Sequence, residues 1–294
     1  PYLYLSTQVF DGSQQRETRI MDAKIIAGHV RTLSYGDDEA KGRAARALWA
    51  FLAALQEPSE EIIVIAAAGA IPILIDIIRT GRTGAAKHHA LGALANLTRG
   101  PSVIKDAVAA AGGPNGSIAL FVEFMRSGSE YQKEYAATTL AHLAKNSDER
   151  KIAIKIAGAL PPAIHLARSG GDITKERAAA LLRSLACHKD NGVAIALAGG
   201  IPPLVALEES GPAGAKTQAA AALKNLARDV DIELRIATTR GTAALVDMAR
   251  HGGFFKKDAA KDAAARLLAE RRRSIVHKCV DGKVPAELEP IVAA

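Results

Sequence analysis

The sequence has few of the residues on which cross-linked, sheet-based and catalytic proteins depend. Its 294 residues include 2 cysteines, so no disulfide framework of the kind found in small secreted proteins is expected. Aromatic residues make up 4% of the chain, with a single tryptophan, whereas β-sandwiches and barrels need many more aromatic and β-branched residues. There is no Ser/His/Asp arrangement in a supporting context and no phosphate-binding glycine loop. We therefore expect neither an enzyme nor a bound cofactor.

Alanine and small aliphatic residues dominate what is present. The chain has 60 alanines, and 49% of its residues are apolar. Charged residues at 23% and a mean hydropathy of +0.07 are not typical of a disordered chain. Many alanines with few large side chains favour closely packed helices. The net charge of +7 and the isoelectric point of 9.4 arise mainly from the C-terminal end of the chain.

The histidines and cysteines do not predict a metal site. His88 and His89 are adjacent, so on a helix they point in different directions. Cys187 and Cys279 each have a histidine close by, but 92 residues separate them, whereas structural zinc sites have paired ligands at short spacing. The apolar stretch from Ile62 to Ile78 is short for a bilayer span and contains Pro72 and Asp76. We interpret it as two helices that meet at a turn.

Internal repetition is the strongest pattern in the sequence. An Ala-Gly-(Ala/Gly)-(Ile/Leu)-Pro motif occurs at 68–72, 157–161 and 198–202. A small residue or histidine or tyrosine followed by glycine recurs at Gly36, Gly81, Gly128, Gly170, Gly211 and Gly252, 41 to 47 residues apart. Alanine-rich stretches end at Leu55, Leu97, Leu143, Leu185, Leu226 and Leu268, 41 to 46 residues apart. Three markers with one period of about 42 indicate a repeat array, with an insertion at 113–116 in the longer unit.

Each unit is predicted to contain three helices. A short one, such as 191–197, ends at a glycine that can take the left-handed conformation. A proline just inside the next helix, as at Pro202, suits a first turn, and that helix stops at Ser210-Gly211. The third helix, 216–228, has apolar residues at helical spacing. No unit could bury its apolar face alone, so stacked neighbours would share one core.

The motif at 198–205 and the pattern Ala93-Leu94-Ala95-Asn96-Leu97, repeated at 222–226, resemble the armadillo repeat family over roughly residues 20–275. HEAT repeats are the nearest alternative, but the short first helix and the Gly-Ile-Pro turn favour armadillo. The resemblance implies an all-α, right-handed α-solenoid of about six armadillo repeats. We expect an N-terminal extension at 1–19, units at 20–60, 61–101, 102–147, 148–189, 190–230 and 231–275, and a C-terminal tail at 276–294.

The resemblance also implies that the third helices line a concave groove. In members that bind extended peptides, an asparagine ladder one residue before each marker leucine bonds the peptide backbone, as a carboxamide can both donate and accept. Here the polar residues at these positions are Asn96, His142, Ser184 and Asn225. The tryptophan sockets of importin-α-like members are missing, because their positions hold Ala50, Gly92, Thr138, Ala180 and Ala221. Trp49 is one residue out of register and is assigned to the core or the N-terminal cap.

Cations one turn further along the third helices would favour an acidic partner over a basic one. They are Arg99, Lys145 and Arg228, with Arg177 on the preceding turn of its own helix. The plainer interpretation, which does not exclude the first, is that last-turn cations complement helix dipoles. A basic C-terminal patch is formed by Lys256, Lys257, Arg271, Arg272 and Arg273. It is interpreted first as a solvated cap, then as a protein contact, and last as a contact to nucleic acid or anionic lipid, since only Phe254 and Phe255 could stack on bases.

The leading hypothesis is a non-catalytic scaffold that binds protein or peptide partners through the groove or the solenoid ends. A second is a structural accessory subunit of a large assembly, with an organelle as one candidate location. It is motivated by the first residue being Pro1, by the high isoelectric point and by the apolar termini. A third, a nuclear-transport cargo adaptor, is disfavoured by the missing tryptophans. An intracellular location, cytoplasmic or organellar, fits all three, and the partner stays open.

Overall fold

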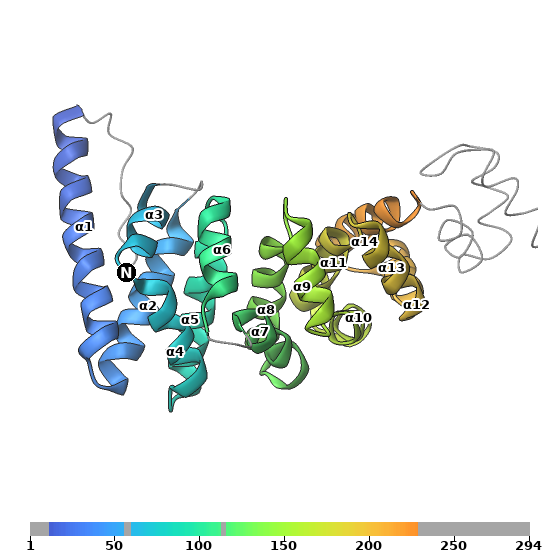
Figure 1. Cartoon of the computed structure of the whole chain (residues 1–294), viewed down its shortest axis with the longest axis horizontal. Helices are drawn as coiled ribbons and strands as arrows, with labels where there is room; N and C mark the ends of the chain where they lie inside the picture. The colour runs from blue at the N-terminus through green and yellow to red at the C-terminus, as the bar shows by residue number, and fades with distance from the viewer. Residues whose placement is uncertain (1–11, 56–59, 113–115, 229–294) are drawn as a thin grey trace, which may run out of the picture. The chain divides into compact units, whose positions relative to one another are not determined.

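The alanine-rich segments form helices throughout the described chain, and no strand occurs there. The computed structural model describes residues 12–55, 60–112 and 116–228, with side chains from residue 24 onward (Figure 1). Its helices are α1 (Gly12–Tyr35), α2 (Asp38–Ala54), α3 (Glu60–Ala67), α4 (Ala70–Thr80), α5 (Gly84–Leu97), α6 (Ser102–Ala110), α7 (Gly116–Ser127), α8 (Glu130–Leu143), α9 (Asp148–Ile156), α10 (Leu160–Ser169), α11 (Asp172–Leu185), α12 (Lys189–Leu197), α13 (Ile201–Ser210) and α14 (Ala213–Leu226).

From α3 onward the helices recur in groups of three with nearly constant lengths. The first helix of each group has 8 or 9 residues, the second 10 to 12, and the third 14. The third helices α5, α8, α11 and α14 all end at a marker leucine, and these four leucines are at most 1% exposed. The third helix of the last described group begins at Ala213, three residues before the predicted start. The unit boundaries themselves stay a prediction.

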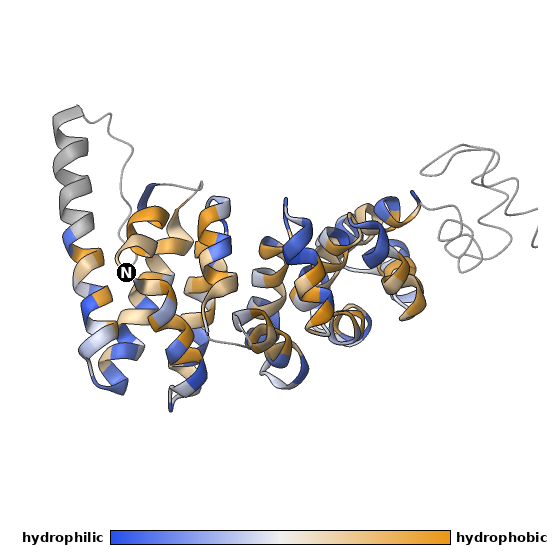
Figure 2. Cartoon of the chain, in the orientation of Figure 1, coloured by the Kyte–Doolittle hydropathy of each residue, from blue (hydrophilic) through white to orange (hydrophobic). Residues whose placement is uncertain are grey.

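The described chain divides into two compact units, residues 1–162 and 163–294. In the first, α2 packs on α5 and α5 on α8, while α4 and α7 pack on α5 and α8 respectively. In the second, α14 packs on both α11 and α13. Apolar and polar residues alternate along the helices in each unit (Figure 2), and the fully buried side chains are mostly leucine, isoleucine and alanine. Shared burial between neighbouring helices therefore supplies the core, as expected for stacked repeats.

Glycines with a left-handed backbone set the turn between first and second helices. Gly69, Gly158 and Gly199 have φ of 84°, 80° and 76°, a region that side chains with a Cβ rarely occupy. The prediction that the short helix ends at such a glycine is confirmed at Gly199. The predicted turn within 62–78 is also confirmed, because α3 ends before Gly69 and α4 begins directly after it.

The second glycine marker is explained by close packing of the backbone. Gly81, Gly128, Gly170 and Gly211 follow the second helices, and each N–H donates to the carbonyl four residues earlier at 2.9–3.0 Å. A Cβ at any of them would lie 2.4–2.7 Å from that same carbonyl oxygen. Any other residue at this position would force the helix end to shift, which accounts for the recurrence of glycine.

Some expectations concern residues at the ends of the chain. Helix α1 begins at Gly12, within the segment expected as an N-terminal extension. The predicted unit at 231–275 and tail at 276–294 lie outside the described residues. Among the described helices, no single one is long and apolar enough to cross a membrane, although the bent pairs α3–α4 (69°) and α12–α13 (88°) meet the length and composition criteria together.

Candidate functional site

The two predicted ladder residues of the first unit form different hydrogen bonds. Asn96, half-buried near the end of α5, donates from Nδ2 to the carbonyl of Gly92 at 3.0 Å, one turn back in its own helix. His142 of α8 has its Nδ1 3.1 Å from the Thr98 hydroxyl and 3.2 Å from the Ala95 carbonyl oxygen. His142 therefore ties α8 to the end of the neighbouring third helix, α5. The sequence pattern predicts His142 at a ladder position but does not predict this contact.

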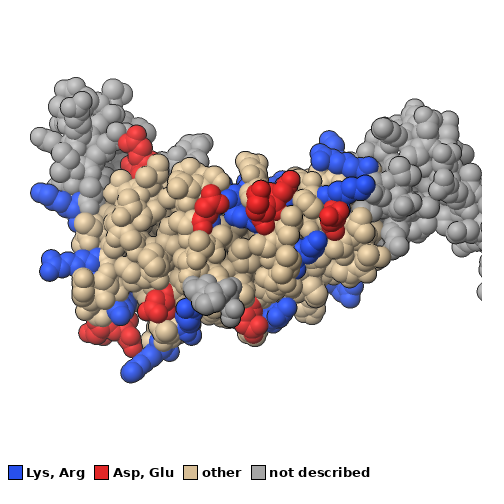
Figure 3. Space-filling model, in the orientation of Figure 1, with Lys and Arg blue, Asp and Glu red and all other residues tan. Residues whose placement is uncertain are grey.

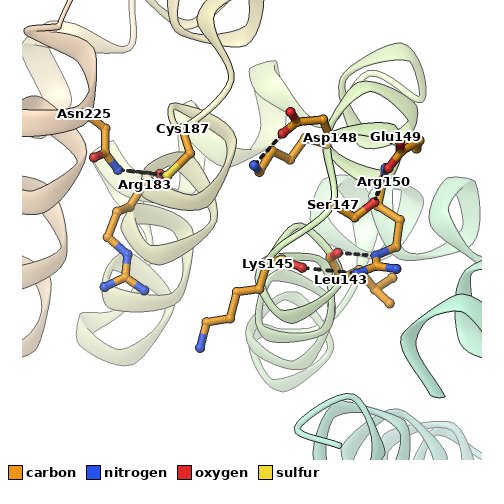
Figure 4. Close-up of polar contacts among 10 residues, drawn as sticks. Leu143, Lys145, Ser147, Asp148, Glu149, Arg150, Arg183, Cys187 and Asn225 are labelled. Atoms are coloured by element: carbon orange, nitrogen blue, oxygen red, sulfur yellow. Dashed lines mark hydrogen bonds and ion pairs between the residues drawn. The ribbon is translucent and has the colours of Figure 1, made fainter. Parts of the chain in front are cut away.

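In the second unit, Asn225 makes the equivalent link between α14 and α11 (Figure 4). Its Nδ2 donates to the carbonyl of Arg183 at 3.0 Å and lies 3.2 Å from the sulfur of Cys187. Ser184 is 6% exposed, and its hydroxyl donates to the Ala180 carbonyl at 3.0 Å within α11. Asn225 is the more exposed of the two residues.

The predicted cations differ in their surroundings. Lys145 and Arg228 are exposed, and Arg99 is half-buried. Arg177 pairs with Glu176 at 3.1 Å, so its charge is partly neutralised within α11. Lys145 and Arg228 are thus the two predicted cations that are best exposed to a partner, one in each unit. Whether any of these residues binds a partner stays a prediction.

A cavity of about 210 Å³ lies beside Asn225 in the second unit. Its walls come from the end of α11, the start of α12 and the end of α14. It is lined by Ala186, Cys187, Lys189, Gly192, Asn225, Leu226 and Arg228. Among the described residues, its lining has two cations, Lys189 and Arg228, and no carboxylate, which favours an anionic group.

Arg150 is a buried cation that the sequence analysis missed. It lies in α9, is 6% exposed, and pairs with Asp106 of α6. Its Nε donates to the Leu143 carbonyl at 2.6 Å and its Nη2 to the Lys145 carbonyl at 3.1 Å (Figure 4). These carbonyls belong to the last turn of α8 and the residues after it, where helical partners are lacking. Arg150 therefore fixes the backbone that carries Lys145. An arginine in an apolar helix face was the available signal.

A cluster of five aromatic and imidazole rings, Trp49, His88, His89, Tyr131 and Tyr135, was also missed. We call it the ring cluster. It lies on α2, α5 and α8, all in the first unit. The Trp49 ring stacks on His89 with centroids 5.6 Å apart and an interplanar angle of 27°. It meets His88 and Tyr135 edge-on at 5.5 and 6.3 Å. Trp49 is half-buried in this cluster rather than enclosed in the core, and both adjacent histidines reach it.

Gly92 makes room for the tryptophan. A Cβ at Gly92 would lie 2.6 Å from Cδ1 and 2.7 Å from Nε1 of Trp49, so the indole rests against the α5 backbone. Gly92 is the residue whose carbonyl accepts from Asn96. The available signal was Gly92 itself, a glycine at a position where importin-α-like proteins have tryptophan. The ring beside it comes instead from Trp49 of α2.

Burial affects the titration of the ring cluster. Desolvation lowers the pKa of His88, and desolvation together with the nearby charges of His88 and Arg46 lowers the pKa of His89. Burial is also the main cause that raises the pKa of Tyr135. Each of the three shifts favours the neutral form of its ring.

Charges of both signs lie among the described residues on the face shown in Figure 3. In the first unit, burial and then the charges of Arg150 and Lys145 lower the pKa of Lys105, and the charge of Asp106 opposes this shift. Within the described residues no three His, Cys, Asp or Glu side chains come together as a metal site. The predicted basic patch at 256–257 and 271–273 lies outside the described residues.

Comparison with known proteins identifies the fold. No family model matches the chain. A segment of 74 residues, 25% of the chain, is 34% identical to U-box domain-containing protein 13 of Arabidopsis thaliana, and this match spans 11% of that protein.

Solved structures match over most of the chain. A computationally designed armadillo repeat protein for modular peptide recognition has a TM-score of 0.68 and 22% identity, covering 83% of this chain and 99% of that one. An engineered protein has a TM-score of 0.67 and 26% identity, covering 84% and 96%. A designed armadillo repeat protein in complex with the peptide (KR)4 has a TM-score of 0.66 and 20% identity, covering 81% and 99%. The chain is an α-helical repeat protein. Its fold is that of an armadillo repeat solenoid.

Proposed function

We propose that this chain is a non-catalytic scaffold that binds protein or peptide partners along its third helices and prefers acidic segments to basic ones. The fold supports the first part, because armadillo repeats typically serve as binding scaffolds and one structural neighbour is a peptide complex. That neighbour holds a basic peptide, so the acidic preference rests on this chain's own side chains.

The observation that carries the acidic preference is the position of the exposed cations. Lys145 lies beside the fixed end of α8, close to the buried Arg150 and to Lys105. Arg228 lines the cavity next to Asn225, together with Lys189. In each unit, the residue that links two third helices is followed three positions later by an exposed cation. His142 is followed by Lys145 in the first unit, and Asn225 by Arg228 in the second. Positive potential of this kind attracts carboxylates and repels lysine and arginine.

Peptide titration tests this proposal. An aspartate- and glutamate-rich peptide should bind the full chain more tightly than a lysine-rich peptide of equal length, and added salt should weaken it because exposed charges are screened. The double variant Lys145→Ala/Arg228→Ala should bind the acidic peptide about fivefold more weakly, since an exposed ion pair contributes about 0.5 kcal/mol.

The matched control removes two exposed cations elsewhere, Arg31→Ala/Arg82→Ala, and should leave the affinity within twofold of the parent. Equal, salt-insensitive binding of both peptides would contradict the proposed preference. Tighter binding of the lysine-rich peptide would instead support the nuclear-transport hypothesis.

A second candidate function, a structural subunit of a larger assembly, is favoured by exposed apolar residues on the first helices. Val103 of α6, Ile156 of α9 and Leu197 of α12 are 65%, 76% and 69% exposed. Single apolar residues on a surface are ordinary, but one on each successive first helix is a recurring feature. This candidate predicts that the isolated chain self-associates and that Ile156→Glu reduces the association. A monodisperse monomer by light scattering would count against it.

A further inference from the structure

The ring cluster lies on the helix face that the proposed function assigns to a partner. On α8, Tyr131, Tyr135 and His142 are spaced by four and seven residues, which places them along one stripe. On α5, His88 and Asn96 are eight residues apart, with Gly92 midway, and share one stripe in the same way. The rings therefore continue the ladder residues of the first unit toward the start of each third helix.

The cluster is only partly buried. Trp49, both histidines and Tyr135 are half-buried, and Tyr131 is 64% exposed although its position next to His88 fixes its ring, with centroids 5.3 Å apart. The His88 and Tyr135 rings are also 5.3 Å apart. The five rings are linked through His88 and Trp49 into one continuous aromatic surface. Aromatic side chains lose little conformational entropy on binding because they have only two χ angles.

Charge selects among the ligands that could pack there. Arg46 is close enough to His89 to disfavour a further positive charge, and Glu134 is close enough to Tyr135 to disfavour a negative one. An uncharged ligand is therefore favoured over a lysine, an arginine or a carboxylate.

Hydrogen-bonding capacity narrows the choice further. The phenol groups of Tyr131 and Tyr135 and the imidazole of His88 can hydrogen-bond at the edges of the rings, whereas the indole N–H of Trp49 already bonds Tyr135. A proline-containing segment in the polyproline II conformation presents flat apolar rings and fully solvated backbone carbonyls that accept hydrogen bonds. Rings edged with donors are the usual surface for such segments.

We infer that the ring cluster is a binding subsite for an uncharged, proline-containing stretch of an extended partner. The subsite rests on the proposed peptide-binding function but is separate from the cations. An acidic partner would place its carboxylates at the cations and its proline-containing stretch on the rings.

The single tryptophan of the chain makes the test direct. Trp49 is the only source of tryptophan emission in the 294 residues, so its fluorescence reports this subsite. The probe is an uncharged, tryptophan-free peptide of about ten residues with proline at every third position, so that the prolines share one face. It should change the emission of the full chain saturably, and a peptide with alanine in place of proline should bind at least fivefold more weakly.

Two tyrosine variants form a matched pair. Tyr131→Ala removes the exposed ring of the cluster and should weaken binding about fivefold, in line with the usual strength of an aromatic contact. Tyr35→Ala removes a tyrosine of α1 that is 86% exposed and lies outside the cluster, and should leave binding unchanged. Tyr131→Phe, which keeps the ring, should retain most of the affinity.

The outcomes separate this inference from the proposed function. No saturable emission change up to about 1 mM, which corresponds to only about 4 kcal/mol of binding energy, would overturn the subsite. So would equal binding of the alanine peptide, tighter binding of a lysine-containing one, or an equal loss in both tyrosine variants. Salt-sensitive binding of the acidic peptide with no change in Trp49 emission would overturn the subsite and leave the proposed function standing.

Discussion

Replacing Arg150 by methionine should cost more stability than replacing any other described arginine of the first unit. Methionine fills the space of the aliphatic stem but removes every donor. The carbonyls of Leu143 and Lys145, 2.6 and 3.1 Å from the guanidinium, would lose their partner at a site only 6% exposed. A buried polar group left unsatisfied costs about 1–3 kcal/mol, so the two carbonyls together give a loss of about 2–6 kcal/mol. Asp106 adds little, because its side chain is 61% exposed and stays hydrated.

Urea unfolding monitored by Trp49 emission measures this loss, because Trp49 and Arg150 belong to the same unit. Arg126→Met is the matched control: Arg126 also donates to a carbonyl, that of Gly158 at 3.3 Å, but its side chain is 52% exposed. Water can replace it there, so we expect a loss below about 1 kcal/mol. A loss for Arg150→Met no larger than that of the control would refute the reasoning that burial makes these carbonyls depend on the guanidinium.

Three further predictions concern the ring cluster and the link between third helices. The pKa values of His88 and His89 are lowered in the folded state, so the unfolded chain binds protons more readily. The free energy of unfolding should therefore fall as the pH drops below the ordinary histidine pKa of 6.5. Unfolding curves that do not move between about pH 7 and pH 5 would contradict this prediction. Gly92→Ala should displace Trp49 and shift its emission to longer wavelength. It should also destabilise the first unit, because overpacking costs about 1–3 kcal/mol against a helix-propensity gain of about 1 kcal/mol. An unchanged emission spectrum would show that the indole is not held against α5. Asn225→Ala should cost about 1 kcal/mol by removing the bond from α14 to α11, measured by circular dichroism during denaturation, and a neutral result would show that the bond adds nothing net.

The helical repeat could be predicted because its signals are local and recur. The marker leucines coincide with the ends of α5, α8, α11 and α14, where they are buried, although the predicted helix 216–228 differs from α14 at both ends. A glycine able to turn left-handed predicted the end of α12. The second set of glycines could be placed but not explained. Their reason, a carbonyl within 2.4–2.7 Å of any added Cβ, exists only once the helix and its following turn have formed.

The contacts of the candidate site could not be predicted in the same way, because they join residues in different repeats. The hydrogen bond from Asn225 to Arg183 spans 42 residues and the contact of His142 with Thr98 spans 44. The ring cluster unites Trp49 with residues up to 86 positions away. The sequence pattern considers each position separately, so it predicts a missing tryptophan socket at Gly92. In the structure, the indole of Trp49 from α2 fills the space beside this glycine. Distances of this kind depend on how neighbouring helices pack, which a periodic pattern does not specify.

Hydrogen exchange of the full chain with and without the acidic peptide tests the central claim most directly, because it locates the contact. The account predicts slower exchange at the C-terminal turns of the third helices α5, α8 and α14, around Asn96, His142 and Asn225. Slower exchange confined to the first helices α6, α9 and α12, with the third helices unchanged, would contradict it.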